Sequence, residues 1–442
     1  MDAMARMRRT ALVGAGALGL VAGVLPGAAC AQGAAPQPLP PYRTADGARR
    51  VTGTPSTADA PRLEAGSVYA DELGPGERVY RLVLEQDRSD VYVSAVVRPG
   101  PGAVVGYGDG VEVEVMTTAG RTCPGSAGRA SFGRDPVPLA AAGVRRGGED
   151  ADCATAGTYY AKVTRTAAKG SDRSAWPVEL RVQREPGRGA AGPTAAPSAW
   201  PSGAPVLPGA DAVPRSGGTG FNDARALGAG VWRDELRPGQ TRYYRVPVDW
   251  GQQLGAGAEL AAAALTKPYG SASDGLTVRL YSPYRSLVAS EDTPYDGKQA
   301  AATLGKTPPV AYENRFSSDR AVRDASVAGW YYLAVTLGGK VAEFTEDARP
   351  VPLTLRTDVI GTPAKAPAYR EDPAAGGFGV GAGDRAAAEG GLTAPEEARA
   401  AADRSVLRVV AGAGFGVGTL LLLVLGGWLL LARRGRAATA AG

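Results

Sequence analysis

Acidic residues beside glycines are the side chains in this sequence whose type and spacing fit metal binding. Asp109 and Asp274 each precede a glycine in two related segments, "GDGVEVEV" and "SDGLTVRL", and the stretch "SEDTPYDGK" adds Asp292 and Asp296. Calcium is bound by several oxygen ligands from acidic, glycine-rich loops, so these four aspartates are candidate calcium ligands. The same pattern is also typical of solvated Asp-Gly turns, and we favour this simpler interpretation.

The composition removes the commonest catalytic groups. The chain has no histidine, which excludes Ser-His and Cys-His nucleophile pairs and zinc sites built on imidazole. No Gly-x-x-x-x-Gly-Lys-Ser/Thr segment occurs, so no phosphate-binding loop is predicted. Carboxylates are abundant enough for a carboxylate-pair hydrolase, but the sequence selects no pair. We therefore predict a protein that is not an enzyme, with no catalytic residue and, calcium aside, no cofactor.

The cysteines are few and fit an exported chain. The sequence has three, of which Cys30 lies in an N-terminal leader. If the leader is cleaved after Ala31, Cys123 and Cys153 remain, and two cysteines outside the cell most simply form a disulfide. Closing a loop of about 30 residues would stabilise the fold by ~3–4 kcal/mol on the chain-entropy estimate. Two free thiols are the alternative.

The two ends of the chain predict export and a membrane anchor. Arginines before residue 10 precede an apolar run and a small-residue cleavage region, which is typical of a signal peptide over 1–31. Lipidation of Cys30 and twin-arginine export are alternatives at this end. Residues 409–432 carry no charge and, at ~1.5 Å per residue, can cross a bilayer. The arginines that follow place 433–442 in the cytoplasm, which gives a single-pass type I protein of the cell membrane with an extracellular ectodomain.

Two halves of the chain carry the same series of short segments. The phrase "VYADELGPGERVYRL" at 68–82 returns as "VWRDELRPGQTRYYRV" at 231–246. Three more pairs follow in the same order: "GDGVEVEV" with "SDGLTVRL", "AGTYYAKV" with "AGWYYLAV", and "WPVELRV" with "RPVPLTL". Chance does not explain such a series, so the chain contains two related modules in tandem.

The repeated segments alternate apolar and polar residues. In 111–115 the valines face one way and the glutamates the other, and 178–182 behaves likewise. This alternation predicts strands with one buried face, and Leu-x-Pro-Gly between two strands predicts a turn, with the preceding Asp-Glu carboxylates solvated. Short strands between Gly/Pro turns predict an all-β fold: two antiparallel, jelly-roll-like β-sandwich modules plus a single C-terminal transmembrane helix.

These features divide the chain into eight predicted segments. They are a signal peptide (1–31), a Pro-rich tail (32–59), a first module (60–184), a Pro/Ala/Gly linker (185–227), a second module (228–359), a juxtamembrane linker (360–408), the transmembrane helix (409–432) and a cytoplasmic tail (433–442). The composition of the linkers is that of semi-extended chain, so we expect the modules to be carried on flexible stalks.

Several motifs resemble bacterial pre-peptidase C-terminal domains, which are β-sandwich modules appended to secreted enzymes. The motifs are the run from Gly66 to Glu77, the tyrosine strand after it, the Asp-Gly segment and "AGTYY". "VYVSAVVRPG" at 91–100, "CPGS" at 123–126 and "TAGTYYAKVTR", followed by "WPVEL", are also similar to a segment that follows a von Willebrand factor A domain in actinobacterial single-pass membrane proteins. Only about 30 residues separate the predicted cleavage site from the first module, so we expect no such A domain there. The resemblance covers 60–185 and 228–358 and implies a fold more than an activity.

The predicted role is binding or scaffolding at the surface of a bacterium, with cell-wall glycan or another envelope protein as the partner. Edge strands and four tyrosines, Tyr107, Tyr281, Tyr284 and Tyr295, are the predicted contact surface. The net charge is only +5 and the basic residues are scattered, so no nucleic-acid partner is expected. Two alternatives are an accessory subunit of an extracellular hydrolase and a passive spacer.

Overall fold

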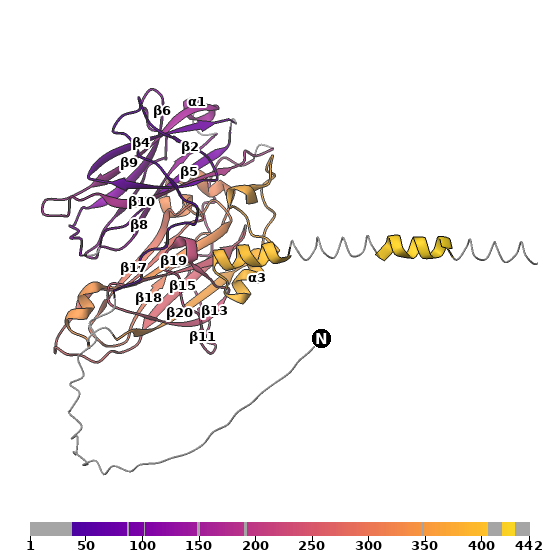
Figure 1. The fold of residues 1–442 in the computed structure, drawn as a ribbon. Coiled ribbons are helices and arrows are strands. Elements are labelled where there is room, and N and C mark those ends of the chain that lie inside the picture. The colour runs from indigo at the N-terminus through magenta and orange to yellow at the C-terminus, as the bar shows by residue number, and fades with distance from the viewer. Residues whose placement is uncertain are drawn as a thin grey trace, which may run out of the picture. The chain divides into compact units, whose positions relative to one another are not determined.

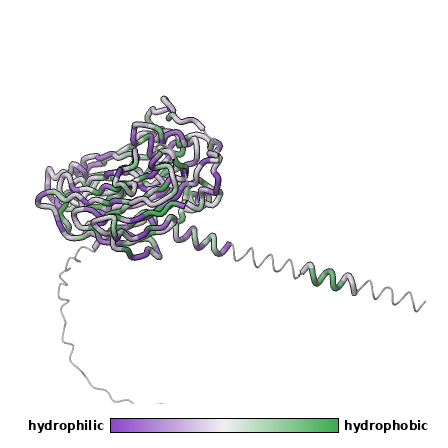
Figure 2. The backbone as a smooth tube through the Cα atoms, turned by 90° about the horizontal axis from the view of Figure 1, so that it is seen from above, coloured by the Kyte–Doolittle hydropathy of each residue, from purple (hydrophilic) through white to green (hydrophobic). Residues whose placement is uncertain are grey.

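A computed structural model describes residues 38–85, 88–100, 102–147, 151–189, 192–346, 349–404 and 418–428 (Figure 1). The predicted signal peptide lies outside these residues, as does the predicted transmembrane segment except for 418–428, which is helical. Figure 2 shows that this short helix is hydrophobic. Among the described residues, no helix is both long enough and apolar enough to cross a membrane.

The first ten strands form module 1, which consists of two five-stranded sheets in the orders β1-β3-β10-β5-β8 and β2-β4-β9-β6-β7. Alternating residues from both sheets fill the space between them with one apolar core. The strands are β1 (Arg49–Arg50), β2 (Arg62–Leu63), β3 (Val68–Leu73), β4 (Gly76–Leu84), β5 (Asp90–Val97), β6 (Gly110–Thr117), β7 (Gly128–Ser131), β8 (Leu139–Arg145), β9 (Gly157–Thr166) and β10 (Trp176–Glu185), and the helix α1 (Ala151–Ala154) precedes β9.

The next ten strands form module 2, whose sheets repeat the same orders, β11-β13-β20-β15-β18 and β12-β14-β19-β16-β17. Its strands are β11 (Val213–Pro214), β12 (Arg225–Ala226), β13 (Gly230–Leu236), β14 (Thr241–Val248), β15 (Gln253–Leu260), β16 (Ala272–Tyr281), β17 (Leu287–Tyr295), β18 (Ala300–Leu304), β19 (Gly329–Leu337) and β20 (Val351–Ile360). The short helices are η1 (Phe221–Asp223), η2 (Tyr312–Phe316), α2 (Arg320–Arg323), η3 (Gly339–Glu343), η4 (Pro373–Gly376) and α3 (Ala382–Gly390), and 394–404 is also helical. The predicted all-β fold of two related sandwich modules is confirmed.

Each module departs from the prediction at its N-terminal edge. Two short strands, β1 and β2, pair in parallel with β3 and β4, and β11 and β12 do the same with β13 and β14. The sheets are therefore not purely antiparallel. The first strands begin at Arg49 and Val213, which lie before the module limits of 60 and 228 expected from the repeats.

The repeated Asp-Glu-Leu phrase holds this N-terminal edge in place. The carboxylate of Asp71 accepts hydrogen bonds from the backbone N–H of Gly53 at 2.7 Å and from the hydroxyl of Tyr80 at 2.8 Å. A Cβ on Gly53 would lie 2.6 Å from the Tyr80 ring, so only glycine allows this close approach. The expectation that this carboxylate is simply solvated is wrong, because it fixes the chain that leads out of β1.

Module 2 repeats the arrangement at the equivalent positions. Asp234 accepts from the N–H of Gly217 at 2.8 Å and from the hydroxyl of Tyr244 at 2.6 Å. Gly217 again lies against the tyrosine ring, where a Cβ would come within 2.8 Å. The two copies of the phrase are therefore explained by one structural role, which is to tie the first strand of each module to its sheet.

The predicted disulfide is confirmed. Cys123 and Cys153 are bonded, with their Cα atoms 5.9 Å apart, and both residues are buried. The bond joins the chain after β6 to α1 and closes a loop with a sequence separation of 30 residues. It stabilises module 1 chiefly by limiting the freedom of the unfolded chain.

Module 2 covers the outer face of one sheet of module 1. Tyr92 of β5 stacks on Tyr284, with ring centroids 4.3 Å apart, and Val96 and Ala140 join an apolar cluster that includes Phe221. Every residue of β5 and β8 is buried, as expected for strands that are covered on both faces. The modules pack directly against each other, which the sequence had left open.

Buried ion pairs cross this contact between the modules. Arg285 of module 2 donates to Glu179 of β10 at 2.6 Å, and both side chains are almost fully buried. Arg315 of η2 contacts Asp90 and also donates to Glu185 at 2.9 Å. A buried charge that loses its partner is strongly destabilising, so these pairs fix the register in which the modules meet.

Candidate binding cleft

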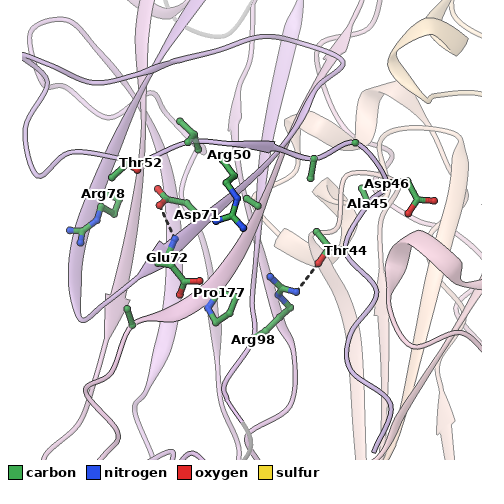
Figure 3. A pocket seen from close by; sticks show the side chains of 15 residues that line it. Thr44, Ala45, Asp46, Arg50, Thr52, Asp71, Glu72, Arg78, Arg98 and Pro177 are labelled. Carbon is green, nitrogen blue, oxygen red and sulfur yellow. Dashed lines mark hydrogen bonds between the residues drawn. The ribbon is translucent and has the colours of Figure 1, made fainter.

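An open cleft with a volume of about 790 Å³ lies on module 1, beside the end of β1 (Figure 3). Residues 44–52 form one wall, and residues of β3, β4 and β10 form the other. The cleft exists because β1 pairs with β3 over only two residues. After Val51 the chain turns away to meet Asp71 through Gly53, so the end of β3 pairs with β10 on one edge and faces the cleft on the edge that β1 has left.

Three guanidinium groups surround the cleft, as Figure 3 shows: Arg50 from β1, Arg78 from β4 and Arg98 from the end of β5. Arg98 is held in place, because it donates to the hydroxyl of Thr44 at 2.8 Å and lies over the ring of Tyr42. In the part of the chain that the structure describes, Arg50 and Arg78 make no ion pair, and Arg78 donates one hydrogen bond, to the carbonyl of Glu77 at 3.1 Å. Their charges are therefore available to a ligand.

The carboxylates of the cleft are mostly engaged. Asp71 accepts from Gly53 and Tyr80, as described above, and also from the N–H of Glu72 at 2.7 Å. Asp46 pairs with Arg43 at 3.0 Å. Glu72 is exposed and has no side-chain partner among the described residues. The unpaired groups are thus mainly cationic donors, which favours a ligand that carries carboxylate or phosphate groups.

The carboxylate of the predicted calcium ligand Asp109 is occupied by protein donors. It is buried and accepts from the N–H groups of Gly106 and Ala168 and from the hydroxyl of Ser171. Burial opposes ionisation, but these hydrogen bonds outweigh it and lower the pKa of Asp109. Its role is to hold the turn before β6.

The other three candidates are only partly brought together. Asp274 and Asp292 line a small pocket with Asp135, and Asp292 accepts from Thr277 at 2.6 Å. Asp296 instead pairs with Lys298 at 3.2 Å. Across the described ranges, no group of three or more His, Cys, Asp or Glu side chains is arranged to hold a metal ion. Calcium binding stays a prediction.

The predicted aromatic contact surface is largely wrong. Tyr281, Tyr284 and Tyr295 are buried, the first two in the contact between the modules and the third in the core of module 2. Tyr107 is exposed, as expected. A second exposed tyrosine, Tyr269, was not selected from the sequence although it precedes the second Asp-Gly segment much as Tyr107 precedes the first.

Sequence reasoning missed the cleft itself. Arg50 and the chain before it lie in the segment expected to be a Pro-rich tail, and arginines are scattered along the whole sequence. Nothing in their local pattern distinguishes the cleft arginines from solvated ones. The adjacent pair Arg49-Arg50 was a weak signal of the cleft. Neighbouring residues of a strand point to opposite faces, so one of the two arginines had to lie on the face that forms the cleft.

Comparisons with known proteins give no family. No protein-family model matches the chain, and no curated protein matches its sequence. Among solved structures, the pre-peptidase C-terminal domain of a collagenase from Bacillus anthracis is 16% identical over 28% of this chain and 95% of that chain, with a TM-score of 0.18. The tandem CBM22 domains of a Paenibacillus barcinonensis protein are 11% identical over 64% and 83%, also with a TM-score of 0.18.

The human MASP-1/3 fragment CUB1-EGF-CUB2 is 6% identical over 66% of this chain and 99% of that chain, with a TM-score of 0.17. Likenesses at these scores carry no argument about function. The similarity to segments that follow von Willebrand factor A domains also stays a prediction. The conclusion that the sheets themselves support is that the chain contains two related β-sandwich modules in direct contact.

Proposed function

We propose that this protein is a non-enzymatic, membrane-anchored component of a bacterial cell envelope that binds an anionic surface polymer through the cleft of module 1. The observation that carries the proposal is that Arg50 and Arg78 line an open cleft and make no ion pair within the described residues. A guanidinium group binds carboxylate and phosphate oxygens through paired hydrogen bonds. The ligand class is therefore a wall polymer that bears carboxylate or phosphate groups.

The chemistry of the cleft favours binding over catalysis. General acid–base catalysis needs a group that can exchange a proton with the substrate, and the chain has no histidine. Asp71 is committed to three hydrogen bonds within the protein. Among the described residues, Glu72 is then the cleft carboxylate without a side-chain partner. Glycoside hydrolysis uses a pair of carboxylates, so Glu72 alone does not meet this requirement.

The anchor and the location rest on the ends of the sequence. The described part of the predicted span, 418–428, is a helix whose leucines and Trp428 are more than half exposed. A largely exposed apolar helix along this stretch supports insertion into a bilayer. Together with the predicted signal peptide, this supports our proposal that both modules lie outside the cell, where an envelope polymer can reach the cleft.

The proposal is tested by retention of the purified full-length protein on isolated cell walls. The variant R50A/R78A removes both cleft charges, and R173A/R233A is the control because it removes two exposed arginines outside the cleft. We expect R50A/R78A to weaken retention about tenfold or more, whereas the control stays within about twofold of the wild type. Retention by the wild type should also fall as salt is added, because the contacts are ionic.

Three results would overturn the proposal. Equal retention of R50A/R78A and the control would show that the cleft is not the binding site. No retention of the wild type on any wall fraction would favour the alternative of a passive spacer. Release of reducing sugar or peptide from the walls would contradict the assignment as a non-enzyme.

A further inference from the structure

Each module carries an exposed tyrosine in the same loop. Tyr107 lies in the loop between β5 and β6 of module 1 and is 91% exposed, and Tyr269 lies in the equivalent loop between β15 and β16 of module 2 and is 100% exposed. An aliphatic residue accompanies each of them: Val104 is 61% exposed and Leu265 is 44% exposed. Large apolar side chains exposed at matching positions of two modules indicate a shared contact role.

The two loops lie at the same end of the pair of modules. The backbone N–H of Phe132 donates at 2.9 Å to the carbonyl of Asp109, which is two residues after Tyr107. Gly133, the next residue, lies against module 2, where a Cβ on it would be 3.3 Å from the Asp274 carboxylate. Asp274 lies in β16, directly after the loop that carries Tyr269, so the segment around Phe132 and Gly133 connects the C-terminal ends of the two loops.

A small polar pocket lies at this junction between the loops. It has a volume of about 40 Å³ and is lined by Asp135 of module 1 and by Asp274, Arg279 and Asp292 of module 2. Asp135 accepts from the N–H of Gly339 at 3.1 Å. Burial, together with the negative charge of Asp274, raises the pKa of Asp135. The pocket has room for a hydroxyl group or a water molecule, but not for a sugar ring.

The backbone holds the module 2 tyrosine outward. Tyr269 has a φ of +65°, a conformation that costs energy for any residue with a side chain. The ring gains no burial in return, because it is fully exposed. Gly270 beside it is packed against Phe344, and a Cβ there would come within 2.2 Å of that residue. The loop is therefore anchored on one side while the aromatic ring projects into solvent.

We propose that this end of the molecule binds a neutral glycan chain, with the rings of Tyr107 and Tyr269 stacking on sugar faces and the carboxylates and guanidinium of the junction pocket binding a sugar hydroxyl. Sugar rings present C–H groups that pack on the negative face of an aromatic ring. Their hydroxyls are bound by charged side chains through strong hydrogen bonds. This glycan site is separate from the arginine cleft and does not depend on it.

The chemistry of the junction favours a glycan over a lipid surface. Insertion of the two tyrosine loops into a bilayer would bring Asp135, Asp274 and Asp292 close to the headgroups. Desolvating carboxylates without enough compensating charge is unfavourable, and anionic headgroups would repel them. A glycan instead provides hydroxyl donors for these same carboxylates.

The test uses isothermal titration calorimetry on the full-length protein in nanodiscs. The probes are the β-1,4-linked hexasaccharides of glucose and of N-acetylglucosamine. We expect one or both to bind the wild type and Y107A/Y269A to bind about tenfold more weakly, since each lost stacking contact weakens binding by roughly three- to tenfold. The variant Y107F/Y269F keeps the stacking faces and should stay within about threefold of the wild type.

Three outcomes overturn the glycan site. The first is that neither hexasaccharide binds the wild type, and the second is that wild type and Y107A/Y269A bind equally well. The third is that the protein in nanodiscs floats together with phosphatidylcholine vesicles and that, of the variants, only Y107A/Y269A fails to do so. Retention of R50A/R78A on cell walls is measured in parallel. If only one of the two double variants binds more weakly than the wild type, the site altered in that variant is supported and the other site has failed.

Discussion

Replacing Arg285 with methionine should destabilise the contact between the modules and reverse its response to pH. Glu179 is almost fully buried and takes its cation from Arg285 at 2.6 Å. It also accepts from the side chain of Asn222 at 2.9 and 3.0 Å and from the N–H of Ala45 at 2.8 Å. Methionine keeps most of the side-chain volume over Phe221 but removes the guanidinium that pairs with Glu179, so that Arg181 of the same strand remains as a cation that interacts with it.

The magnitude follows from burial and charge. Removing one partner of a buried ion pair costs about 3–5 kcal/mol at neutral pH, where Glu179 is ionised. In the wild type, burial opposes ionisation of Glu179, but Arg285 and the hydrogen bonds outweigh it, so the pKa lies below the ordinary value of 4.5. Wild-type stability from this group is therefore present above pH 4.5 and is lost as the pH falls further.

In R285M we expect this balance to reverse, because the variant loses both favourable contributions of Arg285 while burial, the largest single contribution, remains, so the pKa of Glu179 should rise above 4.5. The folded variant takes up a proton before the unfolded chain does, so it gains stability as the pH falls from 7 toward 4.5. Each whole unit in pKa corresponds to about 1.4 kcal/mol. The difference between wild type and variant should therefore be largest near neutral pH and shrink toward pH 4.5.

The assay is urea unfolding of the full-length protein in detergent, followed by circular dichroism between pH 4.5 and 7.5. R173A is the control, because it removes an exposed arginine outside this contact. Two results would refute the reasoning: a loss of unfolding free energy below about 1 kcal/mol at pH 7, against the 3–5 kcal/mol expected for a buried pair, or a loss that does not change with pH.

Three further sets of substitutions test the account of the fold by urea unfolding. Replacing Cys123 and Cys153 with serine should lower the unfolding free energy by about 3–4 kcal/mol, and an unchanged midpoint under oxidising conditions would contradict the role of the disulfide. Asp71→Ala and Asp234→Ala should each lower the unfolding free energy by about 1–3 kcal/mol, because each leaves a buried N–H and a tyrosine hydroxyl unpaired. The loss should be larger for Asp234→Ala, because Asp234 is the more buried, and equal and negligible losses would refute this. Gly53→Ala should cost about 1–3 kcal/mol because its Cβ would overlap the Tyr80 ring, and a variant as stable as the wild type would show that the edge moves freely.

Much of the fold could be predicted from the sequence because strand periodicity is local. The alternation in 111–115 and 178–182 specifies strands β6 and β10 with a buried face. The run "VYVSAVV" of β5 is apolar without alternation, which is typical of a strand that is covered on both faces. The sequence does not say what covers it, because the stacking of Tyr92 on Tyr284 joins residues far apart in the chain.

The cleft could not be predicted for a related reason. Its arginines come from three strands, and they meet only because β1 ends after two residues and Gly53 turns the chain away. The aspartates selected as candidate metal ligands show the reverse case, in which a local pattern suggests a site that the observed contacts do not form. Asp109 has the right type and setting for calcium, but its oxygens are satisfied by backbone and serine donors that no local pattern reveals.

Hydrogen exchange of the full-length protein, measured with and without isolated cell-wall polymer, tests the central claim most directly. Binding in the arginine cleft should slow exchange of the backbone amides at 44–52 and 70–72, and R50A/R78A should abolish this protection. The disulfide loop between Cys123 and Cys153 lies outside the cleft lining and should be unaffected. Protection that spares 44–52 and 70–72 in the wild type, or that persists in R50A/R78A, would contradict the assignment of the cleft as the binding site.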